Sequence, residues 1–190
     1  AAGEEYTELW APGMKKAYNM AGVGSDGDGI HLAEEVGASI TYDTPSFAGG
    51  VYAPVAAAPA NCLLVDGNGN RFIAEDAPAW QVLAAMMRNE TGTFYQIYDE
   101  AQSEGMFEGV SVVLKADTLE ELAEQMGAEA AVLQKTVDRY CELAGREDTD
   151  FGKDAALMTG IGEGPYYAVN VTTYILTAYA GPDITEDCEV

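Results

Sequence analysis

The stretch GNGNRFIAED, Gly67–Asp76, follows the apolar run NCLLV at residues 61–65. Asp-Gly and Asn-Gly pairs at the junction supply the positive φ angles that tight turns need, and the segments on both sides have the apolar character of strands. We therefore expect a β-hairpin whose first strand is 61–65 and whose second strand is 71–73. The second strand opens with a basic residue, Arg71.

Helical and strand-like segments surround this hairpin. Apolar residues recur at helical spacing in some segments and alternate with polar residues in others. This periodicity predicts helices near 29–36, 80–88, 119–126 and 129–144, and strands at 94–98, 110–114, 166–173 and 175–178. The stretch 38–60 is rich in Ala, Gly and Pro, and we expect it to be mostly irregular. Several helices mixed with short, mostly antiparallel strands indicate an α+β fold.

The charge of the chain limits its partners. Nine Lys and Arg stand against 32 Asp and Glu in 190 residues, a net charge of −23. Such a chain repels phosphate backbones, so we expect no binding to nucleic acid. No apolar run approaches the roughly 20 residues that a membrane span needs. The acidic surface favours solubility, and the alternative is that it faces a cation or a basic partner.

Cysteine and histidine offer little for metal or nucleophilic chemistry. Cys62, Cys141 and Cys188 are far apart and lack CxxC spacing, which indicates neither a disulfide framework nor a zinc site. His31 is the single histidine, which argues against a multi-His metal site and leaves only one candidate base for a Ser-His-Asp triad. We expect no metal, with Cys62 packed in the core and His31 on the surface.

Five segments, taken in order, resemble the fumarate reductase and succinate dehydrogenase flavoprotein superfamily. They are SDGDGIHLAEEVGA (25–38), CLLVDGNGNRFIAED (62–76), LKADTLEELAEQMGAEAAVLQKTVDRYCELA (114–144), DTDFGK (148–153) and GPYYAVNVTT (164–173). In that family a capping domain interrupts a flavin-binding domain and closes over the substrate, while hydride moves between the flavin and an activated carbon–carbon bond. The resemblance implies that 1–38 leads from the flavin-binding domain, 39–173 is the capping domain and 174–190 returns to the flavin-binding domain.

The dinucleotide fingerprint of a flavin-binding domain is not convincing here. GVGSDG at 22–27 has the letters of GxGxxG, but no strand is expected before it. We therefore interpret the chain as a capping domain, flanked by small pieces of the flavin-binding domain, excised from a larger bacterial oxidoreductase. We expect FAD in the full-length protein, with the flavin-binding domain of the same parent chain as partner, and little or no flavin or activity in this fragment.

The resemblance also assigns roles to single residues. Arg71 stands in the hairpin motif where the fumarate reductase branch implies a proton donor, although arginine is a poor acid with a pKa above about 12. The alternative is that Arg71 pairs with Glu75 or Asp76 and only fixes the hairpin. Gly27 and Asp28 follow the pattern of a flavin contact at a helix N-terminus, where exposed N–H groups suit a polar cofactor. The alternative is that Asp28 caps its own helix.

Two departures from the family pattern argue against fumarate as substrate. Small and apolar residues fill 52–61, where the fumarate branch has a Glu and an Arg, and Leu176 and Thr177 replace paired histidines. A dicarboxylate without those donors would bind poorly, so we expect another small-molecule enoate or an enone. Tyr179 is predicted to donate a proton, and Tyr52 and Thr177 to contact the substrate. Plain packing is the alternative for each tyrosine.

Two other interpretations of the whole chain stay open. One is a stand-alone α+β module that binds a ligand or a partner without redox activity. The other is a structural domain whose negative charge steers a basic partner, which predicts salt-sensitive association.

Overall fold

The computed structural model describes residues 17–41, 47–52, 62–103, 107, 113–178 and 181–189. The chain forms two compact units, which we call unit 1 and unit 2. Unit 1 comprises residues 1–50 and 173–190, and unit 2 comprises residues 51–172. The chain therefore leaves unit 1, builds the whole of unit 2 and then returns to unit 1. No helix in the described part of the chain is long and apolar enough to cross a membrane.

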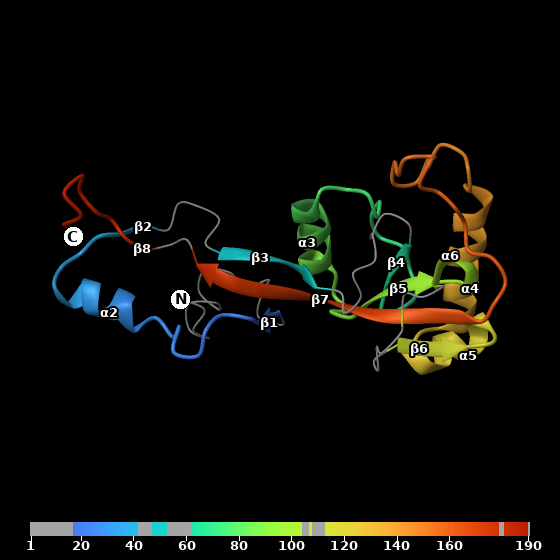
Figure 1. Ribbon diagram of the computed structural model, residues 1–190, viewed down its shortest axis with the longest axis horizontal. Coiled ribbons are helices and arrows are strands. Elements are labelled where there is room, and N and C mark those ends of the chain that lie inside the picture. The colour runs from blue at the N-terminus through green and yellow to red at the C-terminus, as the bar shows by residue number, and fades with distance from the viewer. Residues whose placement is uncertain are drawn as a thin grey trace. The chain divides into compact units, whose positions relative to one another are not determined.

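An antiparallel sheet forms the centre of unit 2 (Figure 1). Its strands are β4 (Leu63–Asp66), β5 (Phe94–Tyr98), β6 (Val113–Ala116) and the first part of β7 (Tyr166–Ala178). β5 pairs with β4 on one side and with β7 on the other, and β6 also pairs with β7. The prediction of two strands at 166–173 and 175–178 is wrong, because β7 is continuous. Tyr174 lies between them without a Gly or Pro to end the strand, and aromatic and β-branched residues favour strand structure.

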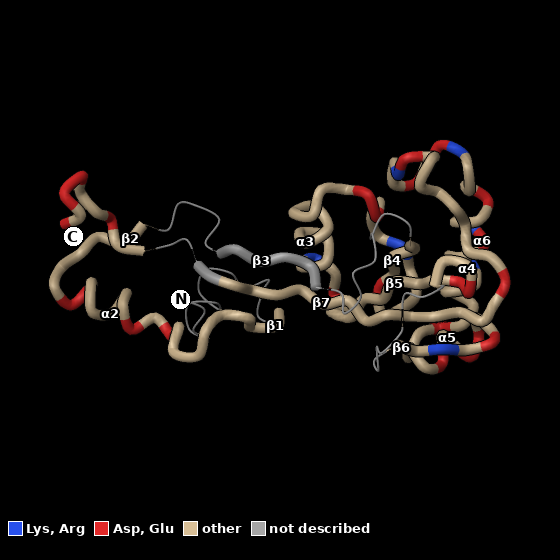
Figure 2. Tube along the Cα trace, viewed as in Figure 1, with Lys and Arg blue, Asp and Glu red and all other residues tan. Residues whose placement is uncertain are grey.

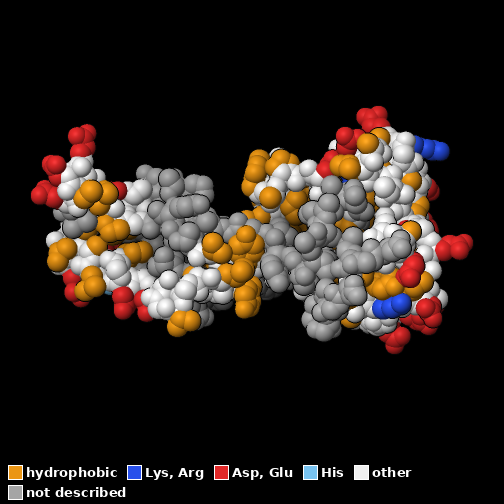
Figure 3. Space-filling view, in the orientation of Figure 1, with side chains coloured by type: hydrophobic (Ala, Val, Ile, Leu, Met, Phe, Trp, Pro, Cys, Tyr) orange, Lys and Arg blue, Asp and Glu red, His pale blue; other side chains and the backbone are white. Residues whose placement is uncertain are grey.

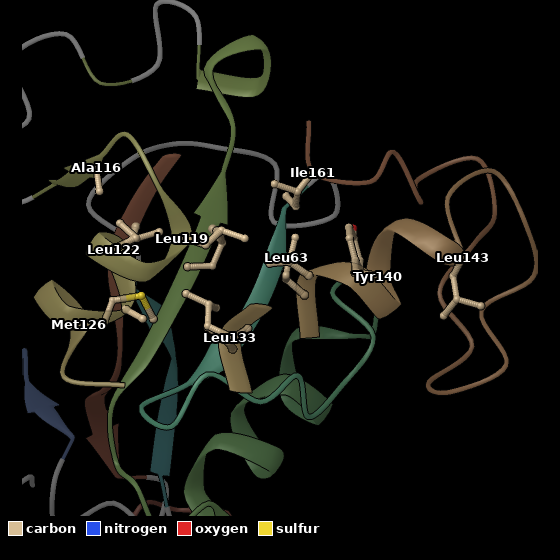
Figure 4. Close-up of a cluster of buried hydrophobic side chains, with 14 of the residues drawn as sticks. Leu63, Ala116, Leu119, Leu122, Met126, Leu133, Tyr140, Leu143 and Ile161 are labelled. Carbon is tan, nitrogen blue, oxygen red and sulfur yellow. The ribbon is translucent and has the colours of Figure 1, made fainter. Parts of the chain in front are cut away.

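Helices cover both faces of this sheet. They are α3 (Ala79–Arg88), α4 (Glu100–Ser103), α5 (Leu119–Met126) and α6 (Ala130–Glu142). Leu63 and Val65 of β4 belong to the large apolar cluster with α5 and α6, whereas Leu64 packs with α3. Successive strand side chains point to opposite faces, so β4 is buried on both sides. Figure 4 shows the cluster, in which α5 and α6 direct Leu122 and Leu133 toward the strands.

The hairpin after β4 is present as a turn, but its predicted second strand is reduced to one bridging residue. Arg71 bridges to Val65, and beyond it the chain leaves the sheet. The carboxylate of Glu75 replaces the missing strand partner, because Glu75 Oε1 accepts a hydrogen bond from the Leu64 N–H at 3.0 Å. A side chain thus satisfies a backbone group that a second strand would otherwise have paired.

Helix α5 begins with a side-chain cap. The spacing of Asp117 and Glu120 predicts a capping box headed by Asp117, but the cap is Thr118. Its hydroxyl accepts a hydrogen bond from the Glu121 N–H at 3.2 Å, which fits a residue of extended backbone placed just before the helix. The helix ends at Gly127, which has a left-handed φ of 75°.

Unit 1 contains short elements. They are β1 (Tyr18–Asn19), α2 (Asp28–Glu35), β2 (Ile40–Thr41), β8 (Gly181–Pro182), the end of β7 and most of β3 (Phe47–Tyr52), whose last two residues belong to unit 2. β1 and β3 pair with β7, and β2 pairs with β8. The expectation that 38–60 is mostly irregular is therefore wrong for β2 and β3. β2 consists of two β-branched residues, which favour strands, whereas the Ala-Gly-Gly part of β3 has low strand propensity and depends on pairing with β7.

The turn at Gly69 lies against the backbone of α6. Gly69 has a φ of 88°, and a Cβ placed on it would lie 3.2 Å from the N, Cα and Cβ atoms of Leu133. Gly127 has a similar φ of 75°, but a Cβ there would meet nothing within 4 Å. Substituting each glycine by alanine therefore distinguishes the free-energy cost of a left-handed backbone, present at both positions, from the cost of steric contact, present at Gly69 alone.

Replacing Gly69 by Ala is expected to lower the free energy of unfolding of unit 2 by about 3 kcal/mol, because backbone strain and overpacking add. The matched Gly127→Ala variant is expected to lose about 1 kcal/mol, from backbone strain alone. Urea unfolding followed by circular dichroism measures both. Equal losses in the two variants would show that the turn does not press on α6.

Candidate functional site

Four charged side chains meet in the interior of unit 2. Arg71, Glu75, Asp148 and Lys153 have side-chain exposures of 6%, 1%, 0% and 0%. Arg71 and Glu75 lie in the segment after the hairpin turn, and Asp148 and Lys153 lie in the loop after α6. We call these four residues the buried charge cluster. The cluster joins two segments that are far apart in the sequence.

Arg71 is held by two carboxylates. Its Nε and Nη2 atoms donate to Glu75 Oε1 and Oε2 at 3.0 and 2.9 Å, and Nη2 also donates to Asp148 Oδ2 at 2.8 Å. The guanidinium carbon lies 5.1 and 5.0 Å from the ring centroids of Tyr140 and Phe151. Burial opposes the charge, but the hydrogen bonds from Glu75 and Asp148 raise the pKa of Arg71 above its ordinary value. A higher pKa makes Arg71 a weaker acid.

Lys153 lies on the other side of Glu75. Its Nζ atom is 3.2 Å from Glu75 Oε2, and it donates to the Cys62 carbonyl at 3.0 Å and to the Tyr140 hydroxyl at 2.6 Å. The ammonium group therefore has three acceptors, which matches its three protons. The Tyr140 hydroxyl in turn donates to the Cys62 carbonyl at 3.2 Å.

Burial also changes the neutral groups next to the cluster. It raises the pKa of the Cys62 thiol to about 12, with the nearby Glu75 adding to the effect. Burial and Glu75 likewise raise the pKa of Tyr140. Both groups therefore stay protonated at neutral pH, and neither is a ready nucleophile or base.

Asp148 organises the loop that carries Lys153. Its Oδ1 atom accepts from the N–H groups of Asp150 and Phe151, and its Oδ2 atom accepts from the N–H of Lys153. Burial acts against ionisation, but the hydrogen bond from Arg71 and these backbone donors lower the pKa of Asp148 to about 2. Asp148 is therefore ionised at neutral pH and is matched by Arg71.

The geometry bears on the two roles considered for Arg71. It brings Arg71 together with Glu75, as the structural alternative predicted, and with Asp148, which the sequence did not predict. Asp76 is not a partner of Arg71 and instead accepts a hydrogen bond from the Asp154 N–H at 2.9 Å. The proton-donor role of Arg71 stays a prediction, since its ion pairs give it a structural task in addition.

Gly27 and Asp28 lie at the start of α2, in unit 1. Gly27 is the N-cap residue and makes no side-chain cap, but Asp26 Oδ1 accepts a hydrogen bond from the Asp28 N–H at 3.3 Å. The alternative that Asp28 caps its own helix is wrong, because Asp28 already has helical backbone, one residue after the cap. Its carboxylate lies in the first turn, where it interacts favourably with the helix dipole. The flavin contact assigned to Gly27 and Asp28 stays a prediction.

The remaining predicted site residues are only partly described. Tyr52 is the last residue of β3 and Thr177 lies in β7, and for both the structure describes the backbone alone. Tyr179 lies outside the described residues. The roles predicted for these three residues therefore stay predictions.

Sequence reasoning missed the partners of Arg71 and Glu75. Asp148 is 77 residues from Arg71, and Lys153 is 91 residues from Cys62. The DTDFGK segment indicated the family, but nothing in its spacing indicated which of its side chains turn inward. A lysine in a loop is expected in solvent, so its burial could not be read from the sequence.

Known proteins similar to this chain are flavoenzymes. A family model described as "FAD binding domain" matches residues 6–190. A fumarate reductase (cytochrome) from Shewanella frigidimarina is 29% identical over 192 residues, which cover 94% of this chain and 34% of that protein. The chain thus spans about a third of the length of this curated relative.

Two solved structures share the fold. The open conformation of a flavocytochrome c3 fumarate reductase is 26% identical, with a TM-score of 0.79, over 96% of this chain and 34% of that one. A 3-ketosteroid-Δ4-(5α)-dehydrogenase from Rhodococcus jostii RHA1, in complex with 4-androstene-3,17-dione, is 26% identical with a TM-score of 0.70, over 99% and 40%. The predicted mixture of sheets and several helices is confirmed.

The depressed pKa of Asp148 gives a testable pH dependence. With a folded pKa of about 2 and an ordinary value of 3.8, ionised Asp148 stabilises the fold above about pH 4, and this contribution is lost as the pH falls toward 2. We expect the stability difference between the natural chain and Asp148→Asn to shrink by about 2 kcal/mol between about pH 5 and about pH 2. Urea unfolding at several pH values measures this difference.

Asp150→Asn is the matched control. Asp150 also pairs with an arginine, Arg139, but its side chain is 32% exposed, so solvent screens the pair. The stability difference for this variant is expected to change much less over the same pH range. A difference for Asp148→Asn that stays constant with pH would contradict the assignment.

Proposed function

The chain belongs to the FAD-binding domain family, whose members include fumarate reductases, and from this we propose that unit 2 is the substrate-capping domain of an FAD-dependent oxidoreductase. The parent enzyme would transfer hydride between the flavin and an activated carbon–carbon double bond. Unit 1 would then consist of small pieces of the FAD-binding domain, from which the cap emerges and to which it returns.

The path of the chain is the observation that carries this proposal. Unit 2 is a continuous segment, whereas unit 1 is assembled from two segments on either side of it. Unit 2 also has its own core on both faces of its sheet. A self-contained domain inserted into a second domain has the organisation that a cap over an active site requires.

The exposed apolar side chains of unit 1 argue for a partner domain that packs against it. Seven of the nine large apolar side chains exposed in the described residues belong to unit 1: Tyr18, Met20, Val23, Leu32, Val36, Leu176 and Ile184 (Figure 3). Among the described residues, only Ile30 and Ile175 are buried apolar side chains of unit 1. Exposed apolar side chains in this proportion favour packing against more protein. We assign that protein to the remaining FAD-binding domain of the same parent chain, and expect little flavin to bind without it.

Five of the six predicted site residues have a place in this scheme, and the role of Arg71 requires a separate test. When bound, FAD supplies or accepts the hydride. The N-terminus of α2, with Gly27 and Asp28, would contact the flavin. Tyr52 and Thr177 would contact the substrate, and Tyr179 would exchange the proton at the second carbon of the double bond. Closing the cap would exclude water from the reacting atoms.

The substrate class follows from the side chains near the end of β7. Leu176 is apolar and 47% exposed, and Thr177 carries no charge. Neither supplies the positive charge of a protonated histidine, which would pair with a dicarboxylate. We therefore propose a small-molecule enone, or an enoate other than fumarate.

An assay of the full-length parent enzyme tests this proposal. With reduced viologen as electron donor, we expect kcat/KM for cyclic enones such as 4-androstene-3,17-dione, or for monocarboxylic enoates, to exceed that for fumarate by at least about 100-fold. A protein without flavin absorbance would contradict the oxidoreductase proposal. Activity confined to fumarate would contradict the substrate class alone.

Two variants of the same enzyme test the proton donors. Tyr179→Phe is expected to lower kcat by about 100-fold or more, without changing the unfolding temperature. Arg71→Lys is expected to lower the unfolding temperature, because lysine cannot replace the bidentate pair with Glu75. An unchanged kcat for Tyr179→Phe would remove Tyr179 from the mechanism. A loss of kcat in Arg71→Lys with unchanged stability would favour the proton-donor role of Arg71.

A further inference from the structure

Unit 2 contains a cavity of about 480 Å³ beside the buried charge cluster. It lies between α6, the end of the hairpin turn at Arg71 and the loop at Phe151. Its volume is within the range of about 300–1,000 Å³ that is typical of small-molecule sites. Of the predicted site residues that the structure fully describes, only Arg71 lines this cavity, and Gly27 and Asp28 do not.

Cationic side chains are concentrated in the cavity wall. Arg71, Lys135 and Arg139 line it, which is three of the nine Lys and Arg in the chain. Along the described trace, acidic residues are far more frequent than basic ones (Figure 2). Asp150 is the single acidic residue of the wall, and Arg139 binds both of its carboxylate oxygens at 2.8 Å.

Two hydrogen-bond donors of the wall are left for a ligand. Arg71 binds carboxylates through Nε and Nη2, and among the described residues its Nη1 atom has no acceptor. No described polar side-chain atom is both buried and without a partner, so Nη1 is not completely buried, and Arg71 lines the cavity. Lys135 is exposed on α6 and forms no ion pair within the described chain.

The rest of the wall favours an apolar ligand body. Val132 and Leu143 of the α6 region and the rings of Tyr140 and Phe151 line the cavity. The Phe151 side chain is 42% exposed, so a flat group placed against it would remove apolar surface from water. The carboxylates behind Arg71 keep its guanidinium in one orientation, so a ligand would not have to order it.

We propose that this cavity binds a small organic carboxylate with a flat apolar body. The carboxylate would accept hydrogen bonds from Arg71 Nη1 and Lys135 Nζ, and the flat body would lie against Phe151 and Val132. This site would give the capping unit a ligand of its own, in addition to the substrate proposed for the parent enzyme.

Titration of the isotope-labelled 190-residue chain, followed by NMR, tests the proposal. Benzoate is expected to shift the backbone amide signals of Val132, Thr136 and Phe151 in a saturable way, with a Kd of about 1 mM. Benzamide has the same shape without the charge, and inorganic phosphate has the charge without the ring. Both are expected to bind at least about threefold more weakly.

Two lysine variants locate the charge. Lys135→Met is expected to weaken benzoate binding about threefold, as for a partly exposed ion pair. Lys115→Met makes the same change in β6, outside the cavity wall, and is expected to leave the affinity unchanged. Any of three results would overturn the proposal: no saturable shifts at the cavity, equal binding of benzoate and benzamide, or equal effects of the two variants.

Discussion

The charged side chain of Lys153 is buried in the interior of unit 2, where the carboxylate of Glu75 pairs with it. The two groups are 3.2 Å apart and have side-chain exposures of 0% and 1%. Each charge taken out of water costs several kcal/mol, which is offset only when the geometry is good and the other donors and acceptors are satisfied. Here Glu75 also binds Arg71 and the Leu64 N–H, and Lys153 also binds Cys62 and Tyr140. The sheet, α6 and the loop after it therefore depend on one another through a single carboxylate.

This arrangement explains why a motif can identify a family without identifying its chemistry. Glu75 completes the hydrogen bonding of β4, and Arg71 and Lys153 neutralise Glu75 together with Asp148. Apolar residues of similar size could fill the same space, but they would not specify which loop atom meets which hairpin atom. We infer that the charges are kept for this specificity.

Local sequence patterns predicted many helices and strands of unit 2, but they could not predict contacts between residues that are far apart in the sequence. The helices α3 and α5 and the strand β5 were predicted from their own periodicity, because each buries one face or both within a single segment. β2 was missed because it has two residues and a distant partner, and β3 because Ala and Gly in its middle are poor strand formers. The α5 cap was misplaced by one residue because Asp117 and Thr118 both have capping side chains. The contacts of Glu75 with Arg71 were within reach of the sequence, whereas Asp148, Lys153 and the cavity beside them required the fold.

The continuous strand β7 also affects the order in which the chain can fold. β1 pairs with the far end of β7, where Tyr18 faces Tyr174. The residues between them include all of unit 2, whose strands and helices can pair and pack among themselves as soon as residue 172 is available. Closing unit 1 requires a much longer loop, and among its described residues only Ile30 and Ile175 are buried apolar side chains. The entropy cost of closing that loop is therefore offset late in folding. During synthesis from the N-terminus, β1 therefore cannot pair until the end of β7 has been made. Unit 2 forms before that pairing is complete.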